Sequence, residues 1–217
     1  NTEAQCVAAG KLKYEDGTFE NCYGWNNTVT DGRYVMLFTP TAYPWNFNTI
    51  CIALSRLAAG PTSLTFDVVV YDNSGAGGAP GNLVATVPGL VANAIPIWNT
   101  LAWYDFDISS VPTLTSGSYY IGAKWDASTL SGLIAIGADQ STTTTLQPGY
   151  SWANTGPWTL LTTGFPEYRA MGIRTLGNSG PPCPVVPASN PIPASGTTNV
   201  NALSPGNASW TNGAGTT

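Results

Sequence analysis

The chain has 217 residues, of which 43% are hydrophobic and only 9% are charged. Its net charge is -5 and its seven Lys and Arg residues are scattered, so no basic stripe neutralises phosphates and no nucleic-acid partner is expected. The chain contains no histidine, which excludes Ser-His-Asp and Cys-His nucleophile systems and histidine metal sites. Its apolar runs are too short to predict a membrane span.

The first sixty residues predict extended segments separated by turns. Residues 11–25 are interpreted as a hairpin that turns at Glu15-Asp16-Gly17. Residues 33–38 form a compact apolar strand, and residues 48–57 alternate between larger and smaller side chains. This spacing of short strands is typical of an all-β protein.

Residues 64–86 carry the clearest pattern in the chain. Phe66, Val68 and Val70 share one face of a predicted strand over residues 65–71. Residues 72–82 are rich in Gly, Asn, Ser and Pro, which permit positive φ and end the strand. An extended pattern then resumes at Leu83, so the segment predicts a long-looped β-hairpin.

The strands expected in the second half follow at similar intervals, with no helical period between them. The segment at 133–138 is short and apolar, which predicts a central strand, and the segment at 150–161 is a hairpin that turns at 154–157. Together these patterns predict an antiparallel, jelly-roll-like β-sandwich. The expected segments are 100–108, 118–125, 133–138, 150–161 and 168–175.

The composition changes near residue 177, which predicts a sandwich domain over residues 1–177 and a tail over residues 178–217. The tail begins with a linker rich in Pro, Gly and Ser and ends in an extended segment that contains Trp210. It is interpreted either as the start of an incomplete module or as a docking strand. Extended segments dock by adding a strand to an exposed sheet edge, so self-association through this tail is expected.

Four cysteines, none in a CxxC pair, indicate disulfides rather than zinc or redox chemistry. Three connectivities are open. We favour Cys22–Cys51 inside the sandwich and Cys6–Cys183 between the two ends, with buried free thiols as the alternative. Together with the start at Asn1, which is not a methionine, this predicts a processed, secreted protein.

Three segments resemble repeated features of jelly-roll-like accessory domains in large secreted bacterial surface proteins: YEDGTFENCYGW, FDVVVYDNSGAGGAPGNL and LTSGSYYIGAKW. The resemblance covers residues 12–175, and the tail resembles the start of a fibronectin- or immunoglobulin-like module. In that family such domains often lie beside peptidase modules or before immunoglobulin-like repeats. The resemblance implies an exported, non-catalytic surface module, and it supplies no catalytic motif.

Two acidic segments are candidates for a reactive or metal-binding site. Asp105 and Asp107 lie two apart on one predicted strand, a spacing that a glycosidase pair can use, but acidic residues on a solvent face are the ordinary interpretation. Asp72-Asn73-Ser74 offers oxygen ligands for calcium, yet an Asx turn explains the same residues without a metal. No catalytic residue and no cofactor are therefore predicted, with calcium as the one candidate ion.

Eight tryptophans and ten tyrosines raise the question of carbohydrate binding, because flat rings stack on sugars. Trp152 and Trp158 flank a predicted turn and are the candidate stacking residues, whereas the alternative is that such rings fill the core. Asn26 and Asn207 match the N-glycosylation sequon, and residues 141–145 are candidates for O-linked sugars.

The leading hypothesis is a secreted, non-enzymatic structural protein, a surface or filament subunit whose tail docks on a neighbouring copy. The alternatives are a carbohydrate-binding or adhesion module and an accessory domain of a larger secreted hydrolase. The adhesion hypothesis requires an exposed, coplanar row of Trp and Tyr beside a polar groove.

Overall fold

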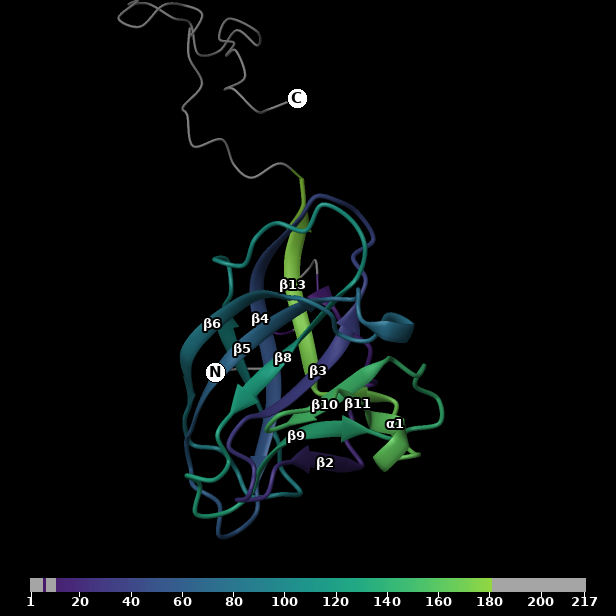
Figure 1. The fold of residues 1–217 in the computed structure, drawn as a ribbon. Helices are drawn as coiled ribbons and strands as arrows, with labels where there is room; N and C mark the ends of the chain where they lie inside the picture. The colour runs from purple at the N-terminus through teal and green to yellow at the C-terminus, as the bar shows by residue number, and fades with distance from the viewer. Residues whose placement is uncertain (1–5, 7–10, 181–217) are drawn as a thin grey trace, which may run out of the picture. The chain divides into compact units, whose positions relative to one another are not determined.

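The computed structural model describes residue 6 and residues 11–180, which form two antiparallel sheets packed face to face (Figure 1). The described part contains one four-residue helix, α1 (Leu161–Gly164), and no helix long and apolar enough to cross a membrane. The predicted all-β sandwich is confirmed. Of the tail that was expected to dock, residues 181–217 lie outside the described residues, so its role and the division at residue 177 stay predictions.

The first sheet contains seven strands in the order β1-β13-β4-β9-β12, with β2 paired to β9 and β7 paired to β4. The strand β4, the longest of them, pairs with β13, β7 and β9, and so lies at the centre of this sheet. The strands are β1 (Lys11–Leu12), β2 (Asn21–Gly24), β4 (Trp45–Arg56), β7 (Ala102–Asp107), β9 (Ile134–Asp139), β12 (Ala170–Met171) and β13 (Ile173–Ser179).

The second sheet contains six strands in the order β11-β10-β3-β8-β5-β6. Its strands β5 and β6 form the long-looped hairpin that the sequence predicts, and β10 and β11 form the later hairpin. The strands are β3 (Gly32–Phe38), β5 (Leu64–Asp72), β6 (Leu83–Ala92), β8 (Tyr119–Trp125), β10 (Gly149–Ala153) and β11 (Thr159–Leu160).

The hydrophobic core lies between the sheets and follows from the alternation of each strand. On β5, for example, Phe66, Val68 and Val70 all face the core and are nearly fully buried. On β4, Ile52 and Leu54 pack into the same cluster from the opposite sheet. Burial of these side chains stabilises the sandwich by roughly 2 kcal/mol for each large residue.

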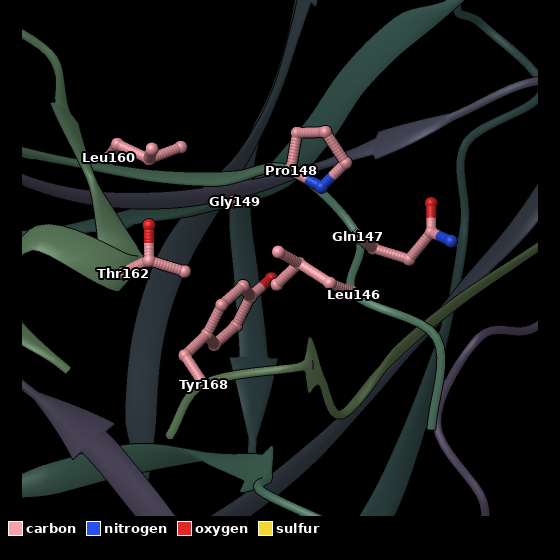
Figure 2. Close-up of a pocket in the computed structure, with 7 residues that line it drawn as sticks. All are labelled: Leu146, Gln147, Pro148, Gly149, Leu160, Thr162 and Tyr168. Atoms are coloured by element: carbon pink, nitrogen blue, oxygen red, sulfur yellow. The ribbon is translucent and has the colours of Figure 1, made fainter. Parts of the chain in front are cut away.

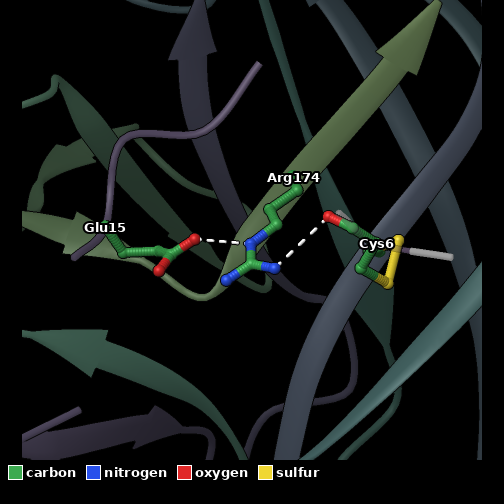
Figure 3. Close-up of a disulfide and its surroundings, with 4 residues drawn as sticks. Cys6, Glu15 and Arg174 are labelled. Carbon is green, nitrogen blue, oxygen red and sulfur yellow. Dashed lines mark hydrogen bonds and ion pairs between the residues drawn. A yellow bond between two sulfur atoms is a disulfide. The ribbon is translucent and has the colours of Figure 1, made fainter. Parts of the chain in front are cut away.

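The expected hairpin over residues 11–25 is wrong. Its first strand, β1, pairs with β13, and its second strand, β2, pairs with β9. Between them Glu15 is 3% exposed and accepts a hydrogen bond of 2.6 Å from Arg174 Nε on β13 (Figure 3). This buried ion pair binds the intervening segment to β13, so the two short strands pair with distant partners instead of with each other.

The expected strand over residues 168–175 is divided at Gly172. The Gly172 N–H donates to the Gly137 carbonyl of β9, and its own carbonyl accepts from the Ala53 N–H of β4. A Cβ at this position would lie 2.7 Å from the Ala53 Cβ, so only glycine permits the close approach. Before Gly172 the chain therefore pairs with β9 as strand β12, and after it the chain pairs with β4 as strand β13.

The favoured disulfide pairing is also wrong. Cys6 pairs with Cys51, with their Cα atoms 5.8 Å apart, and Cys22 is a free thiol. The strand β9 lies between β2, which carries Cys22, and β4, which carries Cys51. That separation of two strand spacings, about 10 Å, exceeds the roughly 7 Å that a disulfide bridges. Cys183 lies outside the described residues.

Candidate functional site

The outer face of the six-stranded sheet brings Trp152, one of the candidate stacking residues, beside a row of charges. Strand register places Trp152 of β10 opposite Arg33 of β3, Arg33 opposite Lys124 of β8, and Lys124 opposite Asp67 of β5. The strand neighbours of Arg33, Lys124 and Asp67 belong to the inner core, so these three side chains point away from it, and Trp152 shares its side of β10 with Tyr150, which packs on the outer face. We call this set the polar row.

A small apolar cluster lies on the same outer face, beside the polar row. Trp158, which precedes β11, packs against it and contacts Tyr71 edge to face at 5.1 Å between ring centroids. Trp158 also contacts Trp152 at 5.2 Å. The cluster consists of buried Val35, Val69, Tyr71 and Tyr120 with partly buried Leu37, Tyr150 and Trp158.

Arg33 is held in place from three sides. Its Nε and Nη2 donate to the two carboxylate oxygens of Asp31, and its Nη1 donates to the Tyr71 hydroxyl. Its guanidinium lies 5.0 Å from the centroid of the Trp152 ring, within reach of a cation–π interaction. The hydrogen bond from Arg33 lowers the pKa of Asp31, so both groups are charged at neutral pH. The fixed guanidinium is therefore oriented before any ligand arrives.

A polar hollow of about 230 Å³ lies at the Lys124 end of the polar row. Asp67 on its wall accepts a hydrogen bond from the Gly89 N–H, and Asp126 accepts from the Ser128 N–H and hydroxyl. These contacts orient the carboxylates without using all their acceptor positions. The hollow is lined by Thr30, Thr65, Phe66, Asp67, Lys124, Trp125 and Asp126.

The two candidate tryptophans contact each other but do not form the coplanar row that the adhesion hypothesis requires. Both are half-buried, and their ring planes are inclined at 62°. A sugar ring can therefore stack on one indole face while the other indole forms a side wall. Two other tryptophans fill the core, which was the alternative to sugar binding. Trp45 is only 5% exposed and belongs to the core, and Trp25 stacks on Tyr34 and packs against the same core.

The candidate carboxylates have local structural partners. Asp107 is exposed and accepts a hydrogen bond from the Ser109 N–H, which lowers the pKa of Asp107. Asp72 accepts hydrogen bonds from Ser74 and from Asn82 across the glycine-rich loop, and these lower its pKa to about 2. The Asx turn is thus observed at Asp72. Within residues 6 and 11–180, no group of three or more Asp, Glu, Cys or His is placed to hold a metal ion.

The candidate glycosylation positions differ in their exposure. Asn26 is exposed, and its side-chain oxygen accepts hydrogen bonds from Thr28, while Asn207 lies outside the described residues. The threonine-rich loop at 141–145 is less exposed than expected, because Thr144 is buried and its hydroxyl donates to Asp139. Glycan occupancy at Asn26 stays a prediction.

Arg33 and the polar hollow were missed by sequence reasoning. Arg33 has no motif around it, and its role depends on which residues face it across β8 and β10. The one usable signal was the alternation of residues 33–38, which places Arg33 and Val35 on the face opposite Tyr34 and Met36.

No protein-family model matches the chain, and no curated protein matches it. Among solved structures it is similar to the clostridial cysteine protease Cwp84 after propeptide cleavage, with a TM-score of 0.56 and 8% identity over 80% of this chain. A second structure holds the cysteine protease and lectin-like domains of Cwp84, a surface layer associated protein of Clostridium difficile (TM-score 0.47, 9% identity, 70% of this chain). The chain spans 41% and 33% of these two chains, and the first likeness concerns the fold.

Proposed function

We propose that this chain is a non-catalytic, extracellular surface module that binds carbohydrate on the outer face of its six-stranded sheet. The observation that carries the proposal is the polar row, in which Trp152 lies beside the fixed guanidinium of Arg33 and leads to the polar hollow. An apolar ring next to oriented donors and acceptors is what a sugar, with one apolar face and a rim of hydroxyls, requires.

Each part of the row has a distinct role in this proposal. The half-buried indole of Trp152 is the stacking ring of this proposal, and Trp158 forms the wall beside it. Arg33 donates to neighbouring sugar hydroxyls. Because Asp31 and Tyr71 already hold its side chain, binding costs little further conformational entropy at Arg33. The carboxylates and the Lys124 ammonium in the hollow bind hydroxyls of the next sugar unit.

The non-catalytic and extracellular parts of the proposal have separate support. The chain has no histidine. In the candidate carboxylate pair Asp105 and Asp107, the Asp107 carboxylate accepts a hydrogen bond from the Ser109 N–H in the turn that follows β7. The Cys6–Cys51 disulfide and the low share of charged residues are typical of exported β proteins. The similar fold within a longer cysteine protease supports an accessory role beside another domain.

The test is binding of the purified chain to a broad glycan array, followed by titration of the best ligand. Trp152→Ala is expected to weaken binding about tenfold, which corresponds to about 1.4 kcal/mol of lost stacking. Trp98→Ala, which removes another half-buried indole that belongs neither to the polar row nor to the lining of the hollow, is the matched control and is expected to bind normally. An array on which the native chain binds nothing would refute the proposal.

Self-association through an open sheet edge is the second candidate function. Strand β6 pairs only with β5 among the described strands, and it exposes Leu83, Val84 and Val91 at 54%, 43% and 47%. An apolar edge of this kind accepts an added strand, and the tail beyond residue 180 is the expected donor. Electron microscopy of the full chain beside a version truncated after Gly180 tests this, because filaments must disappear on truncation.

A further inference from the structure

A second pocket, of about 170 Å³, opens at the other end of the same sheet, where β10 and β11 meet the segment before β10 (Figure 2). A cavity of similar size holds a benzene-sized molecule. Its rim is apolar, with Leu146 and Leu160 exposed at 49% and 37%. The lining residues are Leu146, Gln147, Pro148, Gly149, Leu160, Thr162 and Tyr168.

The Tyr168 hydroxyl lies beneath the floor of this pocket and has no hydrogen-bond partner among the described residues. Tyr168 is fully buried, and Figure 2 shows its hydroxyl directed toward Leu146 and Gly149. Burial raises the pKa of Tyr168 well above its ordinary value, so the group is a neutral O–H donor. A buried donor without an acceptor is costly and rare, which points to an acceptor that a ligand supplies.

The walls of the pocket are fixed before any ligand binds. The Gln147 N–H donates to the Arg169 carbonyl, and the Pro148 carbonyl accepts from the Leu37 N–H. At Gly149 a Cβ would lie 2.2 Å from the Tyr168 hydroxyl oxygen, so glycine is required for the hydroxyl to reach this level. The pocket is therefore a built feature of the fold.

We propose that this pocket binds the acetamido group of an N-acetylated sugar. The methyl group packs against the two rim leucines, and the carbonyl oxygen accepts a hydrogen bond from the buried Tyr168 hydroxyl once the exposed Leu146 side chain, which lies beside that hydroxyl in Figure 2, moves aside. This inference rests on the proposed carbohydrate binding. The pocket and the proposed sugar site are linked by a short segment of the chain. Trp158 and Leu160 are two residues apart along an extended segment, about 7 Å, so both belong to the same face. A glycan on the aromatic cluster thus passes close to the pocket.

The first experiment uses N-methylacetamide alone, titrated into the full chain and followed by NMR at the Leu146 and Leu160 methyl groups. Shifts at both leucines are expected, and unchanged leucine resonances would overturn the proposal. The second compares binding of the N-acetylglucosamine trimer with that of the de-N-acetylated trimer, and at least tenfold tighter binding of the acetylated trimer is expected. Equal binding of the two trimers, or no binding of either, would overturn the acetamido assignment, whereas the glycan array alone decides whether the carbohydrate-binding function stands.

The Tyr168→Phe variant separates ligand binding from folding. It removes only the unpartnered hydroxyl, so the melting temperature is expected to stay at or above that of the native chain. Binding of the acetylated trimer is expected to weaken about fivefold to tenfold. Tyr104→Phe, at a buried tyrosine of the other sheet, is the matched control and leaves binding unchanged. Unaltered binding in Tyr168→Phe would overturn the role of the hydroxyl.

Discussion

Replacement of Arg174 by methionine is expected to destabilise the domain more than any other change of a charged residue among those described. Arg174 is 1% exposed, and it donates to Glu15 at 2.6 Å and to the Cys6 carbonyl at 3.3 Å. Its guanidinium also lies 3.9 Å from the centroid of the Trp103 ring. One side chain thus joins β13, the segment after β1, and the disulfide (Figure 3).

The magnitude follows from what Arg174→Met leaves behind. The Glu15 carboxylate stays buried, with Lys13 Nζ at 3.5 Å as its remaining ion-pair partner. Removing one member of a buried ion pair costs about 3–5 kcal/mol, and loss of the cation–π contact adds to this. Since small domains are stable by roughly 5–15 kcal/mol, the variant is expected to lose a large share of its stability.

Urea unfolding measures this cost directly. The double variant Glu15→Leu with Arg174→Met removes both charges and is expected to recover at least half of the loss. Arg169→Met, which removes a half-buried guanidinium that donates to the Tyr168 carbonyl, is the matched control and is expected to cost about 1 kcal/mol. The reasoning is refuted if Arg174→Met costs less than this control or if the double variant is no more stable than the single one.

Three further predictions concern the disulfide, the central loop and the free thiol. Replacing Cys6 and Cys51 by alanine opens a cross-link between residues 45 apart and is expected to cost about 4 kcal/mol in urea unfolding, so an unchanged midpoint would contradict it. Asp72, with its pKa lowered from 3.8 to about 2, stabilises its loop above pH 4 and loses this effect as the pH falls through 2. Asp72→Asn is therefore expected to abolish that pH dependence in NMR spectra of the loop, whereas a dependence that persists implicates another group. Burial raises the pKa of Cys22 to about 11, so about one thiol in a thousand is ionised at pH 8. Iodoacetamide is expected to alkylate it slowly in the native chain and rapidly in urea, as mass spectrometry measures; equal rates would argue against its burial.

A strand was predictable from sequence where its apolar residues alternate onto one face and that face packs in the core. Residues 65–71 show the period of two and lie in a strand with the expected inner face, and residues 33–38, predicted as a compact apolar strand, also form one. Their outer faces were not predictable. Val69 and Tyr71 alternate outward, yet both are buried, because Trp158 and its neighbours cover them. Burial of this kind depends on a hairpin that lies far along the chain.

Pairings between distant segments were beyond the reach of local patterns. The turn residues at 15–17 favour a hairpin, and only the buried contact between Glu15 and Arg174 explains why the flanking strands separate. The predicted disulfide pairing was wrong for the same reason, because the spacing of cysteines in the sequence does not show which strands lie between them in the sheet. In the candidate site, aromatic content identified Trp152 and Trp158, but strand register was needed to find Arg33.

The pairing of β1 with β13 has a consequence for biosynthesis. Lys11 meets its partner, Leu176, only when nearly the whole domain has been translated, and the long strand β4 likewise waits for β7, β9 and β13. Until then the growing chain presents the unpaired edges of β3 and β4, which are prone to aggregation. Folding of this domain is therefore expected to be slow and to finish after synthesis, which leaves an interval in which the unfolded chain is available to chaperones.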